Sequence, residues 1–457
     1  MVVSSTSAPL DLRAARRFRD RLRKERRITH KKSIGIRFNL KNLVSDQQLS
    51  RVARETGFVK CRRKVDPAKF FWTLLLGFAA GGRRQIAGMR RAYEASTGDT
   101  LVPSVFYDRF TPAWTKSLKA ILAYVIEKAA APTEVLRGSL TWIKDLVVTD
   151  ATVIRLHDAL AKTSAACRTN HTKAAAKLHI VMSVLGAGPT TVKISDERTH
   201  DTKRFSVGRW CCDRLLIFDL GYYRFALCDA IQRYGGYFLS RLKINANPLI
   251  VAVHGSTPRD ECNLVGQRLK DVLSHLRLPV LDLEVEASFC RRVHAGVHST
   301  ARRRFRLVGI RDEKKGEYHR YVTNLPVDKI PATDIGVIYR ERWAIELTFK
   351  HLKSSFVMAE MPSRKKDVVE FLIYASVLTL LVSTQFLVAI RHKLRQEQHR
   401  LKECRWIRIF SSFASEILRI VNSAPRHAED PVRRLEPLLL VEILDLHRRR
   451  WGLLDQV

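Results

Sequence analysis

Acidic residues are scarce in this sequence. The 457 residues include 45 Asp and Glu against 81 Lys and Arg, which gives a formal net charge of +36 at pH 7. Glycine and proline are also few, and their 21 and 15 residues fall far below the roughly 25–30% share of low-complexity chains. Because 46% of the residues are apolar, wholesale disorder is excluded. A globular protein this basic is expected to bind a polyanion, either nucleic acid or an anionic membrane surface.

Cysteine pairs are missing as well. The eight cysteines form no C-x-x-C motif, which disfavours structural zinc and a disulfide framework. The N-terminal segment lacks the apolar stretch of a secretory signal peptide. These features together predict reduced thiols and a cytoplasmic location.

One uncharged stretch, residues 371–390, is long enough to cross a bilayer. Polar Ser376, Thr379 and Ser383 interrupt it at helical spacing, and no aromatic belt brackets it. We therefore predict a buried helix with a small-residue face, and no membrane partner.

Changes in composition divide the chain into six segments. The predicted segments are a basic arm (1–43), a helical DNA-binding domain (44–140), the first part of an α/β core (141–245), a mostly-β insertion (246–330), the second part of the core (331–392) and a helical C-terminal region (393–457). The arm and the insertion are rich in Lys and Arg, with ten such residues between positions 291 and 320. Runs of this kind suit contacts with phosphates.

The first part of the core reads as a series of strands. Residues 146–154 form an apolar run broken by Asp150, as in a central strand buried on both faces. A hairpin of residues 177–185 and 190–196 follows, and then a short strand at 215–218 that is followed directly by Asp219. A helix at 224–234 and a strand at 236–243 complete this part. In the insertion, residues 303–311 and 317–324 predict a second hairpin.

A long amphipathic helix is predicted to begin near residues 331–334, with Thr333 as its N-cap, and to end before Pro362. At ~100° per residue, four polar side chains share a ~60° stripe beside an apolar stripe that would dock on the sheet. These four are Tyr339, Arg342, Glu346 and Lys353. An alternative interpretation is an exposed helix with ion pairs at four-residue spacing, Arg342 with Glu346 and Glu346 with Lys350.

The three acids Asp150, Asp219 and Glu346 are the strongest chemical signal. An acid within an apolar strand is costly to bury unless it is paired or holds a metal ion. Two such acids on neighbouring strands, with a glutamate facing them, would form an all-oxygen site for Mg²⁺ or Mn²⁺. A pair of these ions serves phosphoryl transfer. A carboxylate pair for glycoside hydrolysis is the rival chemistry, but the basic charge favours phosphodiester substrates.

At this point the sequence resembles a known family. The pattern Tyr339-x2-Arg342-x3-Glu346-x6-Lys353 matches the Y-(2)-R-(3)-E-(6)-K signature of the DDE transposases of the insertion-sequence-four family. The segments around Asp150 and Asp219 resemble the first and second aspartate motifs of that family. Thr199-His200-Asp201 is similar to a His-Asp pair common in it. The resemblance covers roughly residues 45–390.

The resemblance implies an α/β fold with a ribonuclease-H-like core that a mostly-β insertion interrupts, an all-α N-terminal DNA-binding domain and a helical C-terminal region. It implies that Asp150, Asp219 and Glu346 are catalytic and hold Mg²⁺ or Mn²⁺, as two ions. Tyr339, Arg342 and Lys353 would contact the DNA backbone.

The implied activity is binding of terminal inverted repeats, hydrolysis at the transposon ends and joining of the 3′-OH ends to target DNA. The partners would be double-stranded DNA and further copies of the chain, as a dimer or a larger synaptic assembly. The location would be the cytoplasm of a prokaryote, in association with the nucleoid.

Several alternatives stay open from the sequence. Some relatives stack a flipped base on an insertion Trp, but this insertion has none; Phe289, Tyr318 or Tyr321 could replace it or could serve only in packing. His179 and His200 could support the acids or could be ordinary hydrogen-bonded histidines. A catalytically inactive, co-opted DNA-binding protein and a ribonuclease-H-like nuclease are the alternative functions.

Overall fold

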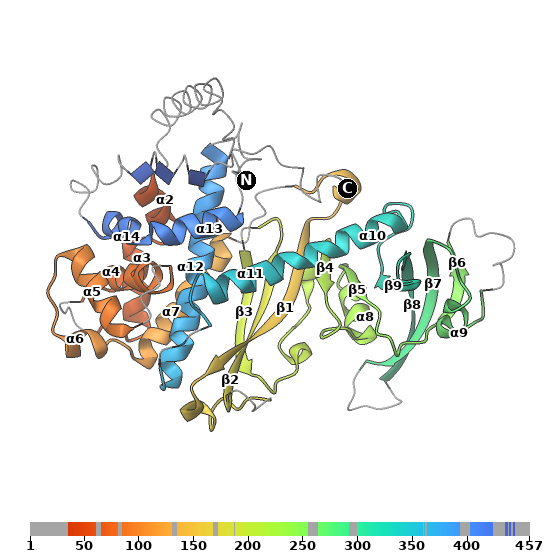
Figure 1. Ribbon diagram of the computed structural model, residues 1–457, viewed down its shortest axis with the longest axis horizontal. Coiled ribbons are helices and arrows are strands. Elements are labelled where there is room, and N and C mark those ends of the chain that lie inside the picture. The colour runs from red at the N-terminus through yellow and green to blue at the C-terminus, as the bar shows by residue number, and fades with distance from the viewer. Residues whose placement is uncertain are drawn as a thin grey trace, which may run out of the picture.

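A nine-stranded sheet with a helical body beside it makes up the computed structural model (Figure 1). The strand order is β3-β2-β1-β4-β5-β9-β8-β7-β6. The structure describes residues 35–60, 65–80, 85–129, 135–167, 172–186, 188–254, 264–291, 299–359, 361, 363–393 and 403–423, together with 435, 436, 438, 439, 442 and 443. A mixed α/β fold, as predicted, is therefore present.

The first five strands in space follow the predicted pattern. The central strand β1 (Asp145–Leu156) pairs antiparallel with β2 (Ala174–Ser183) and parallel with β4 (Arg214–Phe218). Strand β3 (Gly188–Asp196) completes the predicted hairpin with β2, and β5 (Tyr237–Arg241) lies parallel to β4. Because β1 has a strand on both sides and packed side chains on both faces, it carries the near-continuous apolar run that the sequence displays.

The strands of the insertion extend the same sheet. Strand β5 pairs antiparallel with β9 (Glu317–Thr323), which continues through β8 (Thr300–Asp312) and β7 (Val280–Cys290) to β6 (Leu249–Val253). The short helix α9 (Leu269–Leu273) lies between β6 and β7 in the chain. The hairpin predicted near residues 303–324 is confirmed as β8 and β9. The sequence did not indicate that β9 would join β5.

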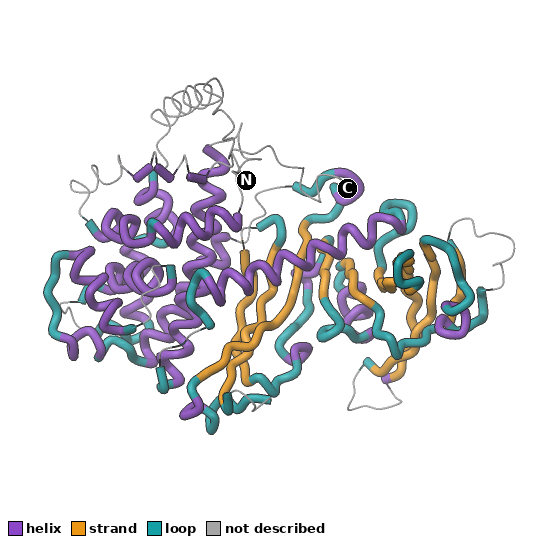
Figure 2. Tube along the Cα trace, viewed as in Figure 1, coloured by secondary structure: helices purple, strands orange, loops and turns teal. Residues whose placement is uncertain are grey.

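Helices from both ends of the chain form the helical body (Figure 2). Asp66 caps α4 by accepting hydrogen bonds from the N–H groups of Ala68 and Lys69, as its place before Pro67 suggests. The elements are α2 (Ile36–Leu43), α3 (Asp46–Glu55), α4 (Pro67–Trp72), a π-helix (Thr73–Ala79), α5 (Ile86–Thr97), α6 (Pro103–Tyr107), α7 (Pro112–Ala129), α12 (Lys366–Lys393), α13 (Glu403–Ser412) and α14 (Ala414–Asn422).

Helix α12 is the core helix predicted for residues 371–390. Among the described residues it passes the length and composition test for a membrane span, but 89% of its most apolar window is buried inside the protein. The hydroxyls of Ser376 and Thr379 are fully buried and donate to the carbonyls of Phe356 and Leu75. Small polar side chains thus let neighbouring segments approach this helix closely.

Two cores cover opposite faces of the sheet. The α11-side core contains Val148 and Ile154 of β1 and joins the sheet to the helical body through α11 (Trp343–Ser354). The α8-side core contains Val147 of β1 and includes α8 (Phe225–Arg233). Successive residues of a strand point to opposite faces, so these cores show which way each strand residue points.

The long helix predicted before Pro362 is not continuous. It consists of α10 (Ala332–Tyr339), a 3₁₀ turn η8 (Arg340–Arg342) and α11, which ends at Ser354. The prediction of Thr333 as the N-cap was wrong, because Pro331 occupies the N-cap position of α10 and no side chain caps this helix. A 3₁₀ turn advances by about 120° per residue rather than ~100°, so it rotates the side chains of α11 relative to those of α10, which regular winding does not describe.

Several predicted basic stretches lie outside the described residues. They are the arm at 11–33, most of the cluster at 60–64, the arginines at 83 and 84 and those at 448–450.

Candidate active site

Asp150 and Asp219 occupy neighbouring positions on two adjacent parallel strands. Thr149 of β1 is opposite Phe218 of β4, so the residues that follow, Asp150 and Asp219, are next to each other along the same edge. Asp150 lies two residues after Val148, which belongs to the α11-side core. Asp219 comes directly after Phe218, which belongs to the α8-side core. Alternation therefore directs both carboxylates toward the α11 face of the sheet.

The surroundings of Asp150 oppose its negative charge. Burial raises the pKa of Asp150 to about 6, and the charges of Asp219 and Asp201 add to this rise. The N–H of Ala151, which donates to Oδ1 of Asp150 at 2.8 Å, and the guanidinium of Arg342 work in the other direction. Asp150 thus lies in a site where negative charge accumulates without full compensation.

Tyr339, the last residue of α10, lies against the second acid. The hydroxyl of Tyr339 donates to Oδ1 of Asp219 at 3.2 Å, and only 8% of Tyr339 is exposed. Its ring packs against that of Tyr321 at a centroid distance of 5.2 Å. Burial and the charge of Asp219 raise the pKa of Tyr339, so the phenol stays protonated and can donate.

Arg342 links the third acid to the other two. Its Nη2 lies 2.6 Å from Oε1 of Glu346, and its Cζ lies 5.8 Å from the centre of the Tyr339 ring. Burial acts against the charge of Arg342, but the hydrogen bond to Glu346 and the charges of Glu346 and Asp219 outweigh it and raise the pKa of Arg342. The ion pair considered as an alternative is present, but it lies beside the two aspartates rather than on a solvent-exposed face.

The three acids do not form a compact metal-binding group in the described part of the chain, where no cluster of three His, Cys, Asp or Glu side chains could hold an ion. Asp150 and Asp219 are adjacent, whereas Glu346 is turned to Arg342. The donor atoms are nonetheless carboxylate oxygens, the ligands of Mg²⁺ and Mn²⁺. The donor set therefore fits such an ion, with Glu346 completing it only if Arg342 releases one of its oxygens.

Lys353 lies at the other end of α11, about 10 Å along the helix from Glu346 at 1.5 Å per residue. Burial lowers the pKa of Lys353, and the positive charge of Arg155 lowers it further. Lys353 therefore lies near Arg155 and apart from Glu346.

A fourth acid, Asp201, was not recognised as such from the sequence. Nζ of Lys177 lies 3.1 Å from Oδ1 of Asp201, and Nδ1 of His179 lies 3.8 Å from the same atom. Gly221, two residues after Asp219, lies close to Asp201, because a Cβ added at Gly221 would be 3.3 Å from Oδ2 of Asp201. Lys177 and His179 share one face of β2 because they are two residues apart. This spacing was the sequence feature that could have indicated a partner acid for them.

The two histidines have ordinary hydrogen-bonded roles. Nε2 of His179 lies 2.8 Å from the hydroxyl of Ser195, and burial lowers the pKa of His179 to about 4, so its ring is neutral near pH 7. His200 caps the 3₁₀ turn η4 (Asp201–Lys203) through Nδ1, which accepts from the N–H of Thr202.

The aromatic residues considered for base stacking have partners within the protein. Phe289 stacks on Phe225, the hydroxyl of Tyr318 donates to the carbonyl of Leu278, and Tyr321 lies against Tyr339. The packing alternative describes all three.

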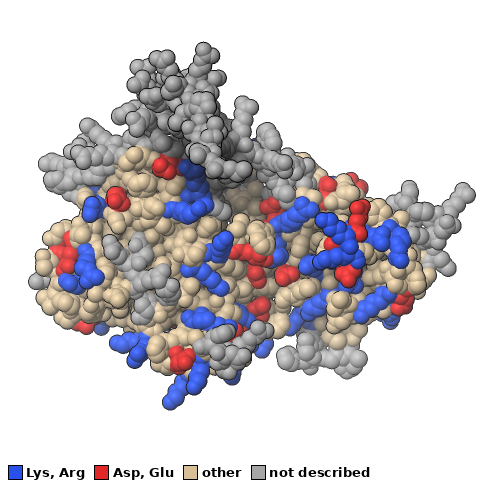
Figure 3. Space-filling view, viewed as in Figure 1, with Lys and Arg blue, Asp and Glu red and all other residues tan. Residues whose placement is uncertain are grey.

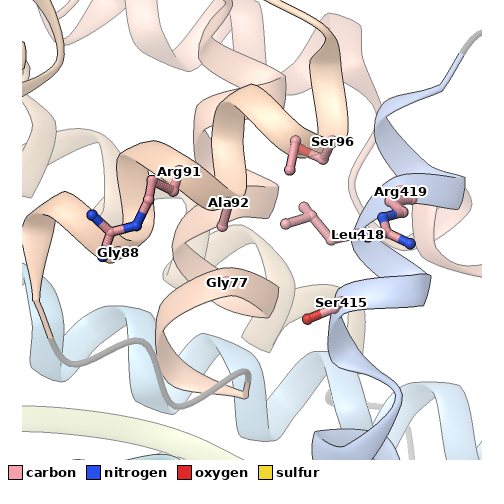
Figure 4. Close-up of a pocket in the computed structure, with 9 residues that line it drawn as sticks. Gly77, Gly88, Arg91, Ala92, Ser96, Ser415, Leu418 and Arg419 are labelled. Atoms are coloured by element: carbon pink, nitrogen blue, oxygen red, sulfur yellow. The ribbon is translucent and has the colours of Figure 1, made fainter.

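A separate cavity of about 230 Å³ lies in the helical body between α5, the π-helix and α14 (Figure 4). Small residues such as Gly77 and Ala92 line it, and Arg91 and Arg419 stand on opposite sides of it. Its lining contains none of the three candidate acids.

Comparison with known proteins finds similar chains and a matching family. The transposase for insertion sequence element IS231B of Bacillus thuringiensis subsp. berliner is 21% identical over 430 residues, covering 87% of each chain. The transposase for element IS231C of the same organism is 22% identical over 423 residues, covering 86% of this chain and 88% of the relative. Among solved structures, a piggyBac transposase synaptic complex with hairpin DNA matches with a TM-score of 0.45 and 11% identity, over 86% of this chain and 84% of that one. Residues 141–382, just over half of the 457, match the family described as Transposase DDE domain, and the chain therefore belongs to the DDE transposases, the enzyme family that its signature residues predicted.

Proposed function

We propose that this transposase cuts and joins DNA phosphodiester bonds with Asp150, Asp219 and Glu346 as its catalytic acids. The observation that carries the proposal is the adjacency of Asp150 and Asp219 at neighbouring positions of parallel strands, near Arg342 of η8, which pairs with Glu346 of α11. All three acids lie within the segment that matches the family. The strand order around β1 supports a ribonuclease-H-like core, with β6–β9 as the insertion.

The acids would hold one or two Mg²⁺ or Mn²⁺ ions. When bound, such ions activate an attacking oxygen and stabilise a leaving one. Asp150 and Asp219 supply the first carboxylates, and the buried Tyr339 hydroxyl orients Asp219. Arg342 pairs with Glu346, and if Glu346 joined the other two acids as a ligand, the guanidinium of Arg342 would have a free edge for a DNA phosphate.

The DNA substrate follows from charge and from the relatives. On the face that carries α10 and α11, Lys and Arg side chains gather over α10 and strands β7–β9 (Figure 3). The relatives are transposases for insertion sequence elements, so the proposed substrate is the pair of terminal inverted repeats of the element that encodes this chain. Two ends must be cut together, which favours a dimer or a larger synaptic assembly. The proposed site of action is nucleoid DNA in a prokaryotic cytoplasm.

The test separates binding from chemistry. Asp219→Asn should keep its affinity for a duplex carrying an element end and lose Mg²⁺-dependent cleavage by at least about 100-fold, because one metal-binding charge is gone. Asp213→Asn is the matched control, because Asp213 is an exposed acid next to the opposite end of β4. This variant should cleave DNA like the wild type. Undiminished cleavage by Asp219→Asn would overturn the assignment. Cleavage without joining to a target duplex would instead identify a nuclease.

A further inference from the structure

A buried aspartate on the other side of the sheet holds three arginines. Asp229 of α8 is 1% exposed. Nε of Arg291 and Nε of Arg303 each lie 2.9 Å from its carboxylate, and Nε of Arg233 lies at 3.2 Å. Burial alone would raise the pKa of Asp229, but hydrogen bonds from Arg291 and Arg303 lower it, so the carboxylate is ionised.

The cluster of Arg233, Arg291 and Arg303 has more positive charge than the Asp229 carboxylate neutralises. One carboxylate neutralises one of the three guanidinium groups, which leaves a surplus of two charges. The side chains of Arg233, Arg291 and Arg303 are 56%, 35% and 46% exposed, and each turns its Nε edge inward. Nη2 of Arg291 also lies 3.4 Å from the Asp229 carboxylate, and Nη1 of Arg303 donates to the carbonyl of Arg302. The remaining terminal N–H groups of these side chains are outward donors in a fixed arrangement.

A purely structural role does not need this arrangement. The insertion already contains a structural ion pair, in which Arg306 and Asp282 are 4% and 12% exposed and match one to one. Helix α8 is fastened to β8 independently, because Phe225 stacks on Phe305 with a centroid distance of 5.5 Å. Three half-exposed arginines on one buried acid instead resemble a site prepared for an external anion.

We infer that Arg233, Arg291 and Arg303 bind the phosphate backbone of double-stranded DNA, with Asp229 as their positioning residue. The inference rests on the proposed function only in taking DNA as the substrate. Guanidinium groups pair with phosphate oxygens through parallel N–H donors, and such contacts do not depend on sequence. Because α8 and Arg303 belong to the side of the sheet opposite the acids, the bound segment is not the one being cut.

The first experiment measures binding alone. A fluorescent duplex of mixed sequence, about 30 base pairs long, is titrated without divalent metal at several salt concentrations. Arg291→Gln with Arg303→Gln should weaken binding about tenfold and reduce the slope of log Kobs against log salt by about 2, near 0.9 per lost contact. The control pair, Arg268→Gln with Arg277→Gln, removes the same charge from exposed positions of the same insertion. An equal loss in both pairs, or no loss in the first, would overturn the site.

The second experiment tests the positioning role. Asp229→Asn makes the protein more positive by one charge, so charge alone predicts tighter DNA binding. Loss of the anchor predicts weaker binding, by about threefold or more, in a variant whose circular dichroism matches the wild type. Tighter or unchanged binding would count against the role of Asp229. If this variant does not fold, the arginine pair still decides the matter.

A third measurement separates this inference from the proposed chemistry. At limiting protein, Arg291→Gln with Arg303→Gln should cleave a duplex with an element end more slowly, in proportion to its weaker binding, whereas Arg268→Gln with Arg277→Gln should cleave at the wild-type rate. Equal cleavage rates for the two pairs would contradict a role of Arg291 and Arg303 in holding the DNA. Failure of the Asp219→Asn test would leave the binding result unaffected.

Discussion

The hydroxyl of Tyr339 donates a hydrogen bond of 3.2 Å to Asp219, a residue 120 positions earlier in the chain. The bond joins the end of α10 to the end of β4, so it ties the turn that carries Arg342 to the pair of aspartates. The orientation of Asp219 and the placement of Glu346 are therefore coupled through one buried phenol.

Replacement of Tyr339 by Phe should slow cleavage without unfolding the protein. The ring would keep its contact with Tyr321, whereas Asp219 would lose the donor that orients it. Hydrogen bonds to charged groups predict a loss of about tenfold in rate, or about 1.4 kcal/mol. Single-turnover cleavage of an element-end duplex would measure this.

Tyr321→Phe is the control, because Tyr321 is an equally buried tyrosine against the same ring and forms no hydrogen bond to the acids among the described residues. Equal rates for the two variants would show that the Asp219 bond has no role in the reaction.

Asp150 should make the protein less stable as the pH rises. Burial raises the pKa of Asp150 from 3.8 to about 6. The folded protein therefore binds more protons than the unfolded chain between these pH values, and its free energy of unfolding falls as the pH increases through them. Asp150→Asn should be more stable than the wild type above about pH 6, by about 1–2 kcal/mol after allowance for partial exposure, and equal to it below about pH 4.

Urea denaturation of both proteins at about pH 4 and about pH 7.5 in metal-free buffer provides the measurement. Asp271→Asn, at an exposed acid of α9, should match the wild type at both. A stability difference that does not change with pH would rule out titration of Asp150 as the cause.

A divalent cation should reverse this penalty. Mg²⁺ or Mn²⁺ bound to the folded protein raises its free energy of unfolding by about 1.4 kcal/mol at roughly ten times Kd. The melting temperature of the wild type and of Asp271→Asn should rise with added Mn²⁺, whereas Asp150→Asn and Asp219→Asn should respond little. Equal rises in all four proteins would place the ion elsewhere.

Most strands and helices of residues 141–245 could be predicted from the sequence. The apolar run around Asp150 predicted β1 because a strand covered on both faces has few polar positions. The placement of β9 beside β5 was not predictable, because antiparallel pairing between strands distant in sequence depends on packing of the whole chain. The break at residues 340–342 was also missed, since periodicity assumes regular winding.

The candidate site was predictable to a similar extent. The position of Asp150 within one apolar strand and that of Asp219 at the end of another indicated two acids on neighbouring strands. Burial of Tyr339 was not indicated, because its partner Asp219 approaches from the sheet rather than along the helix. Asp201 was mentioned only through the resemblance, since its relation to Lys177 and the acids depends on how the loop after β3 folds back.

Lys353→Gln should weaken DNA binding without loss of stability. Burial and the neighbouring Arg155 lower the pKa of Lys353, so its charge is unfavourable in the folded protein. A phosphate contact would explain why such a charge is present. The expected result is an unchanged or higher melting temperature and a salt slope smaller by about 1. Lys350→Gln, at an exposed position of the same helix, is the control, and a lower melting temperature for Lys353→Gln would indicate a structural lysine instead.

The ion pair between Arg306 and Asp282 should support the position of α10. Nη2 of Arg306 lies 2.6 Å from Asp282, and its Nη1 donates to the carbonyl of Ile330 at 2.8 Å, just before α10 begins. Arg306 is 4% exposed, so Asp282→Asn would leave a buried charge without its partner and cost about 3 kcal/mol. The exposed pair of Arg304 and Glu284, at 3.8 Å, offers the contrast, and Glu284→Gln should cost less than about 1 kcal/mol. Because α10 leads directly to Tyr339, Asp282→Asn should also slow cleavage at a temperature where it remains folded. Loss of stability with a normal cleavage rate would show that the ion pair supports the insertion alone.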